Sequence, residues 1–418
     1  MSHIKALFKV KHSWLLLLAF AAIQQQSFAQ KTRKTVFIIV DGIPADVVEK
    51  QSTPNLHEIA KEGGYTRSYV GGLKDMYSQT PTISAVGYNS LLTGTWVNKH
   101  NVWDNDIAEP NYHYPTVFRL FKEAYPQKKI AVYSSWEDNR TKLVGDNMAA
   151  TGNIKVDYHY DGLENDTVTY PHDKAREYMS NIDESVSQHA AQSIKTNAPN
   201  PSWVYLEYTD DMGHMHGDSK EFYHAVELAD KRVGYIWDAI KYREKNFNED
   251  WLIVVTTDHG RTAENGKNHG GQSERERDSW MFTNAKNLNE EFKAPQASIV
   301  DILPSIIRFM NIPVPEKEKY EIDGLPFIGR LAFTKPQVEY RDGNLYVSWK
   351  EGAEKGNLTI KAATTNNVKT GGQDTYTTLA TIPLSKQSAV VSVAKTPSDF
   401  YKVVLQAKDE TFNYWIKK

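Results

Sequence analysis

The chain has 418 residues, of which 40% are hydrophobic and 24% charged, and this ordinary globular composition is long enough for one large domain and a smaller one. The absence of cysteine from the sequence excludes disulfides, thiolate metal ligands and a cysteine nucleophile. The formal net charge is −3 and no basic run accompanies it, which argues against a protein that coats nucleic acid.

The first thirty residues have the pattern of an export signal. Three lysines precede an apolar run at residues 14–23, and a small-residue cleavage site follows at residues 27–29 (SFA). The apolar run is shorter than the roughly 20 residues that span a bilayer, and no second such run follows in the sequence. We therefore expect residues 1–30 to be a signal peptide, and the mature protein to be periplasmic or secreted without a stable membrane anchor.

The first predicted strand spans residues 35–40 (TVFIIV), an apolar run typical of a strand that is buried on both faces of a parallel sheet. It ends at Asp41, which a glycine follows. Taken alone, an Asp-Gly pair at a strand end is most often a turn or a helix cap. A catalytic role for Asp41 therefore depends on what other strands deliver to the same edge.

Residues 77–95 are rich in small and hydroxyl side chains, and they predict a loop that turns into a helix near Thr82 and Ser84. The N-terminus of a helix presents free N–H groups and a positive dipole end, which can hold a phosphate. The alternative is an ordinary helix cap, which is the commoner role of a lone serine in this position.

Predicted helices and strands alternate through the middle of the chain. This order indicates βαβ units and a doubly wound, mostly parallel sheet. Residues 137–172 show no strong period and are assigned only as a lid or connecting region. The remaining predicted elements are a helix that opens at 53–56, helices at 116–124, 173–194, 219–243 and 299–310, and strands at 129–133, 203–208, 252–255 and 279–282.

Three of the predicted strands end in side chains that can bind metal. In open α/β sheets, ligands bind in the crevice beyond the carboxyl ends of the strands. Aspartate and histidine without cysteine suit Zn²⁺ or Mn²⁺ in a catalytic site that keeps an open position, and the number of ligands suffices for two ions. The strand ends and one glycine-rich loop supply Asp41, Asp210, His214, Asp258, His259 and His269.

The pattern changes near residue 336. Short alternating segments follow, separated by Gly, Asn, Asp and Lys, and such spacing predicts a small antiparallel sandwich of the immunoglobulin or fibronectin type. We expect residues 31–335 to form the α/β domain that carries the chemistry, and residues 336–418 to form the sandwich.

The order and spacing of the motifs resemble the alkaline phosphatase superfamily, and most closely its type I phosphodiesterase/nucleotide pyrophosphatase family, over roughly residues 35–330. The resemblance implies an alkaline phosphatase-like fold and two zinc ions that flank a Ser or Thr nucleophile, which forms a covalent phospho-enzyme. Its substrate would be a phosphorylated small molecule, a phosphodiester or a nucleotide. By position, one ion would be held by Asp41, Ser84, Asp258 and His259, and the other by Asp210, His214 and His269.

Two hydroxyl residues compete for the role of nucleophile. In the family the nucleophile precedes a Thr-Gly pair by nine residues, and counting back from Thr93 gives Ser84 rather than Thr82. Family phosphodiesterases also carry an asparagine in an Asp-Asn pair that hydrogen-bonds a non-bridging phosphate oxygen. Asn105 occupies that place here and is the expected oxyanion donor.

Some features leave the substrate open. Ala85 follows Ser84 where nucleotide-cleaving members usually have an aromatic residue, and the segment lacks the Pro and Arg of a sulfatase maturation motif. A phosphomonoesterase or phosphonate hydrolase on the same site is the alternative enzyme. A non-catalytic binding protein with a vestigial metal site is the alternative from another class, although none of the seven expected ligands is missing.

Overall fold

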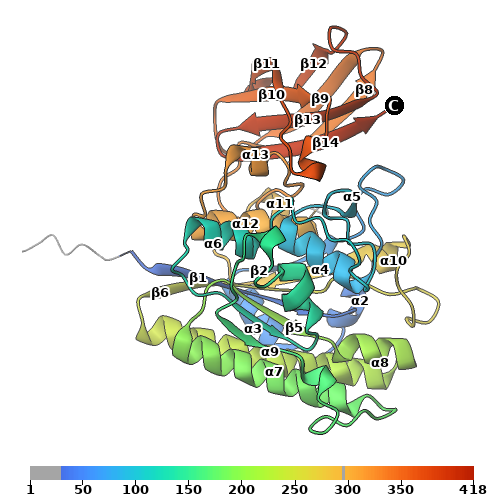
Figure 1. Cartoon of the computed structure of the whole chain (residues 1–418), viewed down its shortest axis with the longest axis vertical. Coiled ribbons are helices and arrows are strands. Elements are labelled where there is room, and N and C mark those ends of the chain that lie inside the picture. Colours follow the sequence, from blue (N-terminus) through green and yellow to red (C-terminus); the bar gives the residue numbers. More distant parts are fainter. Residues whose placement is uncertain (1–29, 294–296) are drawn as a thin grey trace, which may run out of the picture.

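The computed structural model describes residues 30–293 and 297–418, so the predicted signal peptide, except for Gln30, lies outside the described residues. Figure 1 shows two bodies, a larger one around a central sheet and a smaller one made of strands, which contains the C-terminus. None of the helices in the described part of the chain is long and apolar enough to cross a bilayer.

The described residues of the larger body form a seven-stranded sheet in the order β2-β7-β6-β1-β5-β3-β4. The five strands from β6 to β4 run parallel, β7 is antiparallel to β6, and β2 is antiparallel to β7. The predicted mostly parallel sheet is therefore confirmed. The strands are β1 (Thr32–Val40), β2 (Gly64–Tyr69), β3 (Ala131–Ser134), β4 (Tyr158–Tyr160), β5 (Ser202–Leu206), β6 (Glu249–Thr256) and β7 (Asp278–Thr283).

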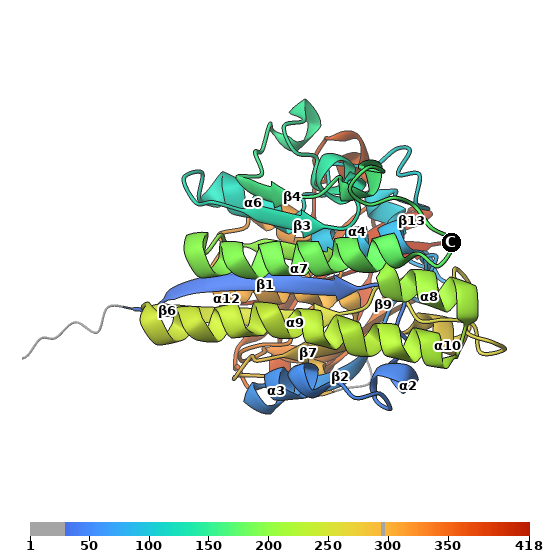
Figure 2. The ribbon, with the colours of Figure 1, turned by 90° about the horizontal axis from the view of Figure 1, so that it is seen from below.

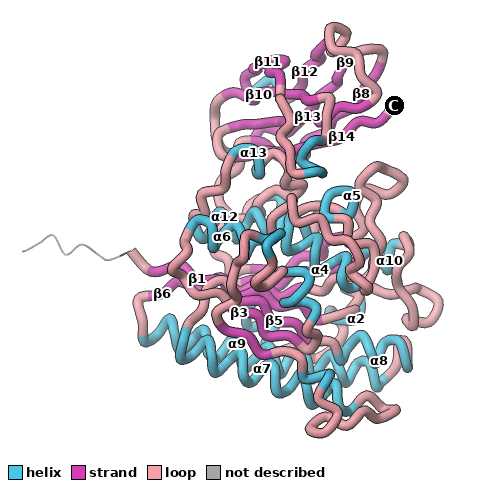
Figure 3. The backbone as a smooth tube through the Cα atoms, in the orientation of Figure 1, coloured by secondary structure: helices cyan, strands magenta, loops and turns pink. Residues whose placement is uncertain are grey.

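Helices cover both faces of this sheet, as expected for a doubly wound fold. Along β1, Phe37 and Ile39 pack into the core under α4, α6 and α12, while Val36 and Ile38 pack into the core under α3, α7 and α9. Figure 2 shows α7 and α9 side by side across the second face, and Figure 3 shows the strands enclosed by helices. The longer helices are α3 (Pro54–Glu62), α4 (Ser84–Thr93), α6 (Val117–Ala124), α7 (Glu177–Asn197), α8 (Tyr208–His216), α9 (Lys220–Asn246) and α12 (Ile302–Met310).

Shorter helical segments connect these elements. The four-residue helices are α2 (Ala45–Val48), α5 (Val97–His100), α10 (Glu274–Arg277), α11 (Glu290–Lys293) and α13 (Glu316–Lys319). A π-helical turn, η1 (Asn139–Val144), and 3-10 turns, η2 (Ala149–Thr151), η3 (Leu163–Asn165), η4 (Ile299–Asp301), η5 (Asn367–Thr370) and η6 (Leu384–Lys386), complete the described segments.

The predicted helices and strands are present, although their ends are shifted. In one place, after the strand expected at 203–208, a helix replaces the expected loop. The strand expected at 203–208 ends at Leu206, and the residues that follow form helix α8 instead of a strand end and loop. This helix places Asp210 and His214 one turn apart on the same face, because residues i and i+4 are neighbours on a helix surface. Strand β2 was not predicted, because its sequence GYTRSY carries no apolar run.

The smaller body is a sandwich of two antiparallel sheets, β11-β10-β13-β14 and β12-β9-β8. Its core lies between the sheets and includes Trp349, Ile360, Val403 and Leu405. The strands are β8 (Phe333–Arg341), β9 (Asn344–Glu351), β10 (Asn357–Ala363), β11 (Thr377–Pro383), β12 (Ser388–Ser392), β13 (Phe400–Ala407) and β14 (Glu410–Lys417).

A buried polar contact joins the two bodies. The Lys99 ammonium, on α5, donates to the Asp323 carboxylate at 2.6 Å and to the side-chain oxygen of Asn413, on β14, at 2.7 Å. The Lys99 side chain is fully buried. Since α5 closely follows α4, the sandwich supports the segment that contains the predicted nucleophile.

Candidate active site

The predicted metal ligands meet at one edge of the sheet. Strand β1 lies between β5 and β6, and all three run parallel, so their carboxyl ends are adjacent. Asp41 follows β1, Asp210 lies in α8 just after β5, and Asp258 follows β6. The strand order therefore brings together side chains from three distant parts of the sequence.

The first ligand group surrounds His259, which is fully buried. Its Nε2 lies 3.3 Å from the Asp41 carboxylate and 3.2 Å from the Asp258 carboxylate. Its Nδ1 lies 2.9 Å from the Gly260 carbonyl oxygen, which can only accept a hydrogen bond. Nδ1 therefore keeps its proton, and Nε2 is the atom that can bind a metal once its own proton is lost.

The electrostatics of this group reflect buried negative charge. Burial would lower the pKa of His259, but Asp258 and Asp41 raise it to about 9. Burial, together with the nearby Asp41 carboxylate, raises the pKa of Asp258 well above its usual range. A divalent cation would remove this repulsion and displace the protons, since metal ligands bind in their deprotonated forms.

The second ligand group is Asp210, His214 and His269, whose ligand atoms all lie within 4.8 Å of one another. His214 Nε2 is 3.2 Å from the Asp210 carboxylate and 3.0 Å from His269 Nε2. His269 Nδ1 donates to the Thr82 carbonyl oxygen at 2.8 Å, which leaves its Nε2 for the site. Burial lowers the pKa of His269 to about 4, so its imidazole is neutral, as a metal ligand must be.

Two buried carboxylate oxygens without hydrogen-bond partners indicate that these residues fit metal ions. Asp41 Oδ1 and Asp258 Oδ2 are buried and have no hydrogen-bond partner among the described residues. Both lie near His259 Nε2, and a buried carboxylate oxygen without a partner costs free energy. The donor set of carboxylates and imidazoles suits Zn²⁺. Asp210 belongs to both ligand groups, since its carboxylate also lies within 4.8 Å of the ligand atoms of Asp41 and His259.

Ser84 is the first residue of α4 and lies beside the first ligand group. Its hydroxyl oxygen is 3.3 Å from His259 Nε2, and the residue is 5% exposed. Helix α4 approaches the end of β6 closely at Gly87, where a Cβ atom would lie 2.7 Å from the Asp258 carbonyl oxygen. A glycine one turn into the helix therefore allows the helix N-terminus, and Ser84 with it, to reach the strand end.

Thr82 has a different environment. Its hydroxyl donates to the Gly271 carbonyl at 2.9 Å and accepts from the Gly270 N–H at 3.0 Å. Both hydrogen bonds hold the loop that carries His269. Of the two hydroxyls, that of Ser84 therefore lies beside the first ligand group, whereas that of Thr82 fixes the loop that carries His269.

Asn105 lies across from the start of α4. Its side-chain oxygen accepts from the Ala85 N–H at 2.9 Å, and its amide nitrogen makes no hydrogen bond within the described residues. The hydrogen bond to Ala85 orients the amide, which can then donate to an oxygen bound at Ser84. This is the arrangement expected of an oxyanion donor.

Two tyrosines were not predicted as part of the site. The hydroxyls of Tyr88 and Tyr205 both donate to Asp41 Oδ2, the latter at 2.8 Å. Oδ1 is thereby left to face the first ligand group. Tyr88 lies four residues after Ser84 on α4, and this spacing on one helix face is the signal that could have identified it.

Arg261 was also missed, although it follows the Asp258-His259-Gly260 motif directly. It is fully buried and donates to the carboxylate of Asp210 and, at 2.9 Å, to the Gly42 carbonyl oxygen. A Cβ atom at Gly213 would lie 2.1 Å from the guanidinium carbon, so only glycine leaves room for it. Burial would raise the pKa of Asp210, but Arg261 and His214 hold it well below its usual range.

A pocket of about 300 Å³ opens beside Ser84 and Asn105. Its far wall comes from the segment assigned as a lid or connecting region and its borders, and includes Trp136, Glu164 and Arg176. Substituents of a substrate held at Ser84 would therefore contact this segment.

Comparison with known proteins places these motifs in context. Residues 35–321 match the family model for type I phosphodiesterase / nucleotide pyrophosphatase. Ectonucleotide pyrophosphatase/phosphodiesterase family member 7 of Mus musculus is 24% identical over 254 residues, which cover 57% of this chain and 52% of that protein. Family member 5 of Homo sapiens is 25% identical over 256 residues, covering 59% and 49%. The chain thus spans about half the length of these curated relatives.

A solved structure supports the fold. The crystal structure of Ps i-CgsB in complex with k-i-k-neocarrahexaose has a TM-score of 0.50 and 16% identity, and the match covers 90% of this chain and 86% of that one. At this identity the likeness shows the fold alone.

Proposed function

The chain belongs to the type I phosphodiesterase/nucleotide pyrophosphatase family, and on this premise we propose that it is a metal-dependent phosphodiesterase with Ser84 as its nucleophile. The observation that carries the proposal is the position of the Ser84 hydroxyl, 3.3 Å from His259 Nε2, the atom that also lies 3.2–3.3 Å from the two carboxylate oxygens without partners. The N-cap position of α4 is held by Ile83, and Ser84 is the first helical residue, so helix capping does not account for the position of this hydroxyl.

The proposed site holds two divalent ions, with Zn²⁺ the best match for the donors. When bound, the ions would lower the pKa of the Ser84 hydroxyl and stabilise negative charge on the departing oxygen. The ligands would be Asp41, Ser84, Asp258 and His259 for one ion and Asp210, His214 and His269 for the other.

The chain's own groups account for two chemical steps. Ser84 Oγ attacks phosphorus, a new O–P bond forms, and the bond to the leaving alcohol breaks, so that an alcohol and a phosphoseryl diester result. Water then attacks phosphorus, the Ser84 Oγ–P bond breaks, and a phosphomonoester leaves. During both steps, the free N–H of Asn105 donates to a non-bridging oxygen that gains charge.

The pocket beside Ser84 favours a diester over a monoester. A monoester carries an extra negative charge, which a free arginine would stabilise. Arg176 carries the positive charge in the described lining of this pocket, but its guanidinium is already bound by Asp211 at 2.6 Å and by Glu207 at 3.1 Å. The proposed substrate is therefore a phosphodiester or nucleotide, and phosphomonoester or phosphonate hydrolysis is the competing activity.

The test combines metal content with turnover. Wild type and Ser84→Ala are compared for bound zinc and for hydrolysis of a bis-aryl phosphate and the corresponding mono-aryl phosphate. We expect two zinc ions per wild-type chain, faster cleavage of the diester, and a loss of about 10³-fold or more in Ser84→Ala, which keeps most of its metal. Faster cleavage of the monoester would overturn the choice of substrate class.

Thr82→Ala is the matched control. Because Thr82 holds the loop of His269, this variant should lose metal affinity but still form a phosphoserine, detectable by mass spectrometry at saturating zinc. If Ser84→Ala stays active and Thr82→Ala forms no covalent adduct, the nucleophile is Thr82. A wild type that binds no metal and cleaves neither ester would support a non-catalytic binding protein.

We also propose export, supported by the basic and apolar pattern of residues 1–30. Sequencing the N-terminus of the protein released from the periplasm or the medium tests this proposal. The expected first residue is Gln30, and a chain that keeps its first residues inside the cell would contradict it.

A further inference from the structure

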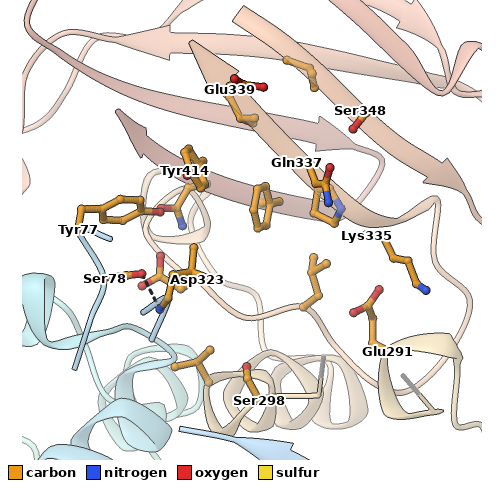
Figure 4. Close-up of a pocket in the computed structure, with 18 of the residues that line it drawn as sticks. Tyr77, Ser78, Glu291, Ser298, Asp323, Lys335, Gln337, Glu339, Ser348 and Tyr414 are labelled. Carbon is orange, nitrogen blue, oxygen red and sulfur yellow. Dashed lines mark hydrogen bonds between the residues drawn. The ribbon is translucent and has the colours of Figure 1, made fainter. Parts of the chain in front are cut away.

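A cavity of about 1010 Å³ lies between the two bodies and shares none of its lining residues with the pocket beside Ser84. Figure 4 shows its walls, with Gln337, Glu339 and Ser348 on the sandwich and Tyr77, Ser78 and Asp323 on the larger body. A volume at the upper end of the range for ligand sites, about 300–1,000 Å³, leaves room for more than one ring-sized group.

The sandwich wall is the outer face of sheet β12-β9-β8. The register pairs Ser348 with both Gln337 and Ser388, and the next outward row pairs Tyr346 with Glu339 and Val390. Side chains alternate between the two faces of a strand, so these two rows point away from the sandwich core. Tyr346 is 39% exposed.

This wall offers polar groups that the protein does not use. The side chains of Gln337, Ser348 and Ser388 make no hydrogen bonds with other described residues, and Gln337 and Ser388 are exposed. Each can donate and accept, and the three lie in one row across neighbouring strands. These three side chains are therefore free to form hydrogen bonds with the hydroxyl groups of a ligand.

Aromatic rings complete the lining. Tyr77 and Tyr414 meet edge to face, with ring centroids 5.3 Å apart, and both are half-buried at the cavity (Figure 4). Tyr77 also stacks on Trp415, with ring centroids 5.8 Å apart, so Tyr346, the most exposed of the three tyrosines, offers the amphipathic surface that can take an apolar C–H face.

The charge of the lining and the orientation of the sheet narrow the chemical class of ligand that fits this cavity. The described lining contains four carboxylates, Glu291, Asp301, Asp323 and Glu339, and a single lysine, Lys335. Asp323 and Glu339 are paired with Lys99 and Arg341, so the lining presents little positive charge to an anionic ligand. The wall is the face of a sheet rather than its edge, so an extended peptide cannot add to it as a strand. The polar rows are poorly suited to a lipid chain.

We propose that this cavity binds a neutral oligosaccharide. The aromatic rings would contact the apolar faces of the sugar rings, while Gln337, Ser348, Ser388 and Glu339 would bind their hydroxyls. The site is separate from the catalytic pocket and would hold a glycan or glycoconjugate against the enzyme. It does not depend on the identity of the nucleophile.

The test uses the full chain and a panel of neutral tetrasaccharides, namely malto-, cello-, xylo-, manno- and chitotetraose, with tetragalacturonate as the anionic comparison. Binding is measured by calorimetry and by saturation-transfer NMR. We expect at least one neutral member to bind, tetragalacturonate to bind at least tenfold more weakly, and inorganic phosphate to leave the binding unchanged.

Tyr346→Ala and Gln337→Ala are the test variants, and Tyr242→Ala is the matched control, since Tyr242 is a tyrosine of similar exposure, 41%, on α9. The test variants should weaken binding at least tenfold and retain the wild-type rate on a bis-aryl phosphate, while the control changes neither. The proposal is overturned if no neutral tetrasaccharide binds at millimolar concentration, if tetragalacturonate binds as well as they do, or if Tyr346→Ala binds like wild type.

Discussion

Arg261 makes two hydrogen bonds to Asp210. Its Nη2 donates to the carboxylate and, at 2.8 Å, to the backbone carbonyl oxygen of the same residue. The carboxylate contact is to Oδ1, while Oδ2 lies 3.2 Å from His214 Nε2. The arginine thus fixes the orientation of a carboxylate that belongs to both candidate ligand groups. A planar guanidinium with several donors is suited to this task, and lysine would not replace it.

Replacing Arg261 should therefore weaken metal binding. In Arg261→Met we expect a loss of about 10–100-fold in zinc affinity, the usual effect of removing a group that orients a metal ligand. The zinc affinity of Arg261→Lys should lie between those of wild type and Arg261→Met, because lysine keeps the positive charge but lacks the several donors of the planar guanidinium. Competition with a chromophoric chelator measures the affinity. If Arg261→Met bound zinc as tightly as wild type, Asp210 would keep its orientation without the arginine.

The paired tyrosines at Asp41 lead to a second expectation. Tyr88→Phe removes one of two donors to Asp41 Oδ2 and leaves Tyr205 in place, so zinc affinity should fall about tenfold while the fold is kept. The double variant with Tyr205→Phe should lose more than either single variant. Tyr133→Phe is the control, since that buried hydroxyl donates to Ser193 at 2.6 Å, away from the ligands. Equal effects at Tyr88 and Tyr133 would point to general destabilisation.

Much of the site was predictable because its residues follow strongly apolar strands. Asp41 and Asp258 each come after a short apolar run that is typical of a buried strand, and parallel strands end at one edge of the sheet. The positions of these two predicted metal ligands therefore followed from the order of the strands, whereas Asp210 and His214 lie on α8 and His269 lies in a loop. The identity of Ser84 rested on a family spacing, and the hydrogen bonds of Thr82 now support that choice from geometry.

The residues that were missed act through side-chain contacts which no local pattern encodes. Arg261 looks like an ordinary surface arginine in the sequence, and only the tertiary structure buries it against Asp210. Helix α8 was missed because its first turn carries two aspartates, a run that reads as a polar loop. Strand β2 pairs at the edge of the sheet, where burial on one face removes the need for an apolar run.

The Lys99 contact predicts that the two bodies unfold as a coupled unit. Lys99→Met should destabilise the protein by about 3 kcal/mol, because it leaves the Asp323 carboxylate buried with one strong partner fewer. Urea unfolding, followed by tryptophan fluorescence, measures the change. Lys350→Met is the matched control, an exposed lysine on β9 whose loss should change stability by less than about 0.5 kcal/mol.

The same variant should loosen the sandwich, since Lys99 also binds Asn413 on β14. Limited proteolysis should then cleave the connection between the two bodies faster than in wild type. If stability falls but cleavage is unchanged, Lys99 stabilises the larger body alone.

Glu410 makes stability depend on pH. Its carboxylate is buried in the sandwich, where it accepts from the Ala332 N–H at 2.8 Å and from Arg308, on α12, at 3.4 Å. Burial raises the pKa of Glu410 to about 7, from an ordinary value of 4.5. Folding therefore favours the protonated form, and the stabilising contribution is complete below pH 4.5 and is lost as the pH rises to about 7.

Glu410→Gln removes this titration. From pH 4 to pH 8, the free energy of unfolding of wild type should fall relative to the variant by about 3 kcal/mol, the value of a shift of this size. Comparing the two proteins by urea unfolding at each pH, with the same zinc concentration, cancels titrations that they share, such as that of Asp301, whose pKa burial also raises to about 7. If the unfolding free energies of wild type and Glu410→Gln differed by the same amount from pH 4 to pH 8, Glu410 would have the same pKa in the folded and unfolded chains. Arg308 and the Ala332 N–H would then offset the burial of its charge.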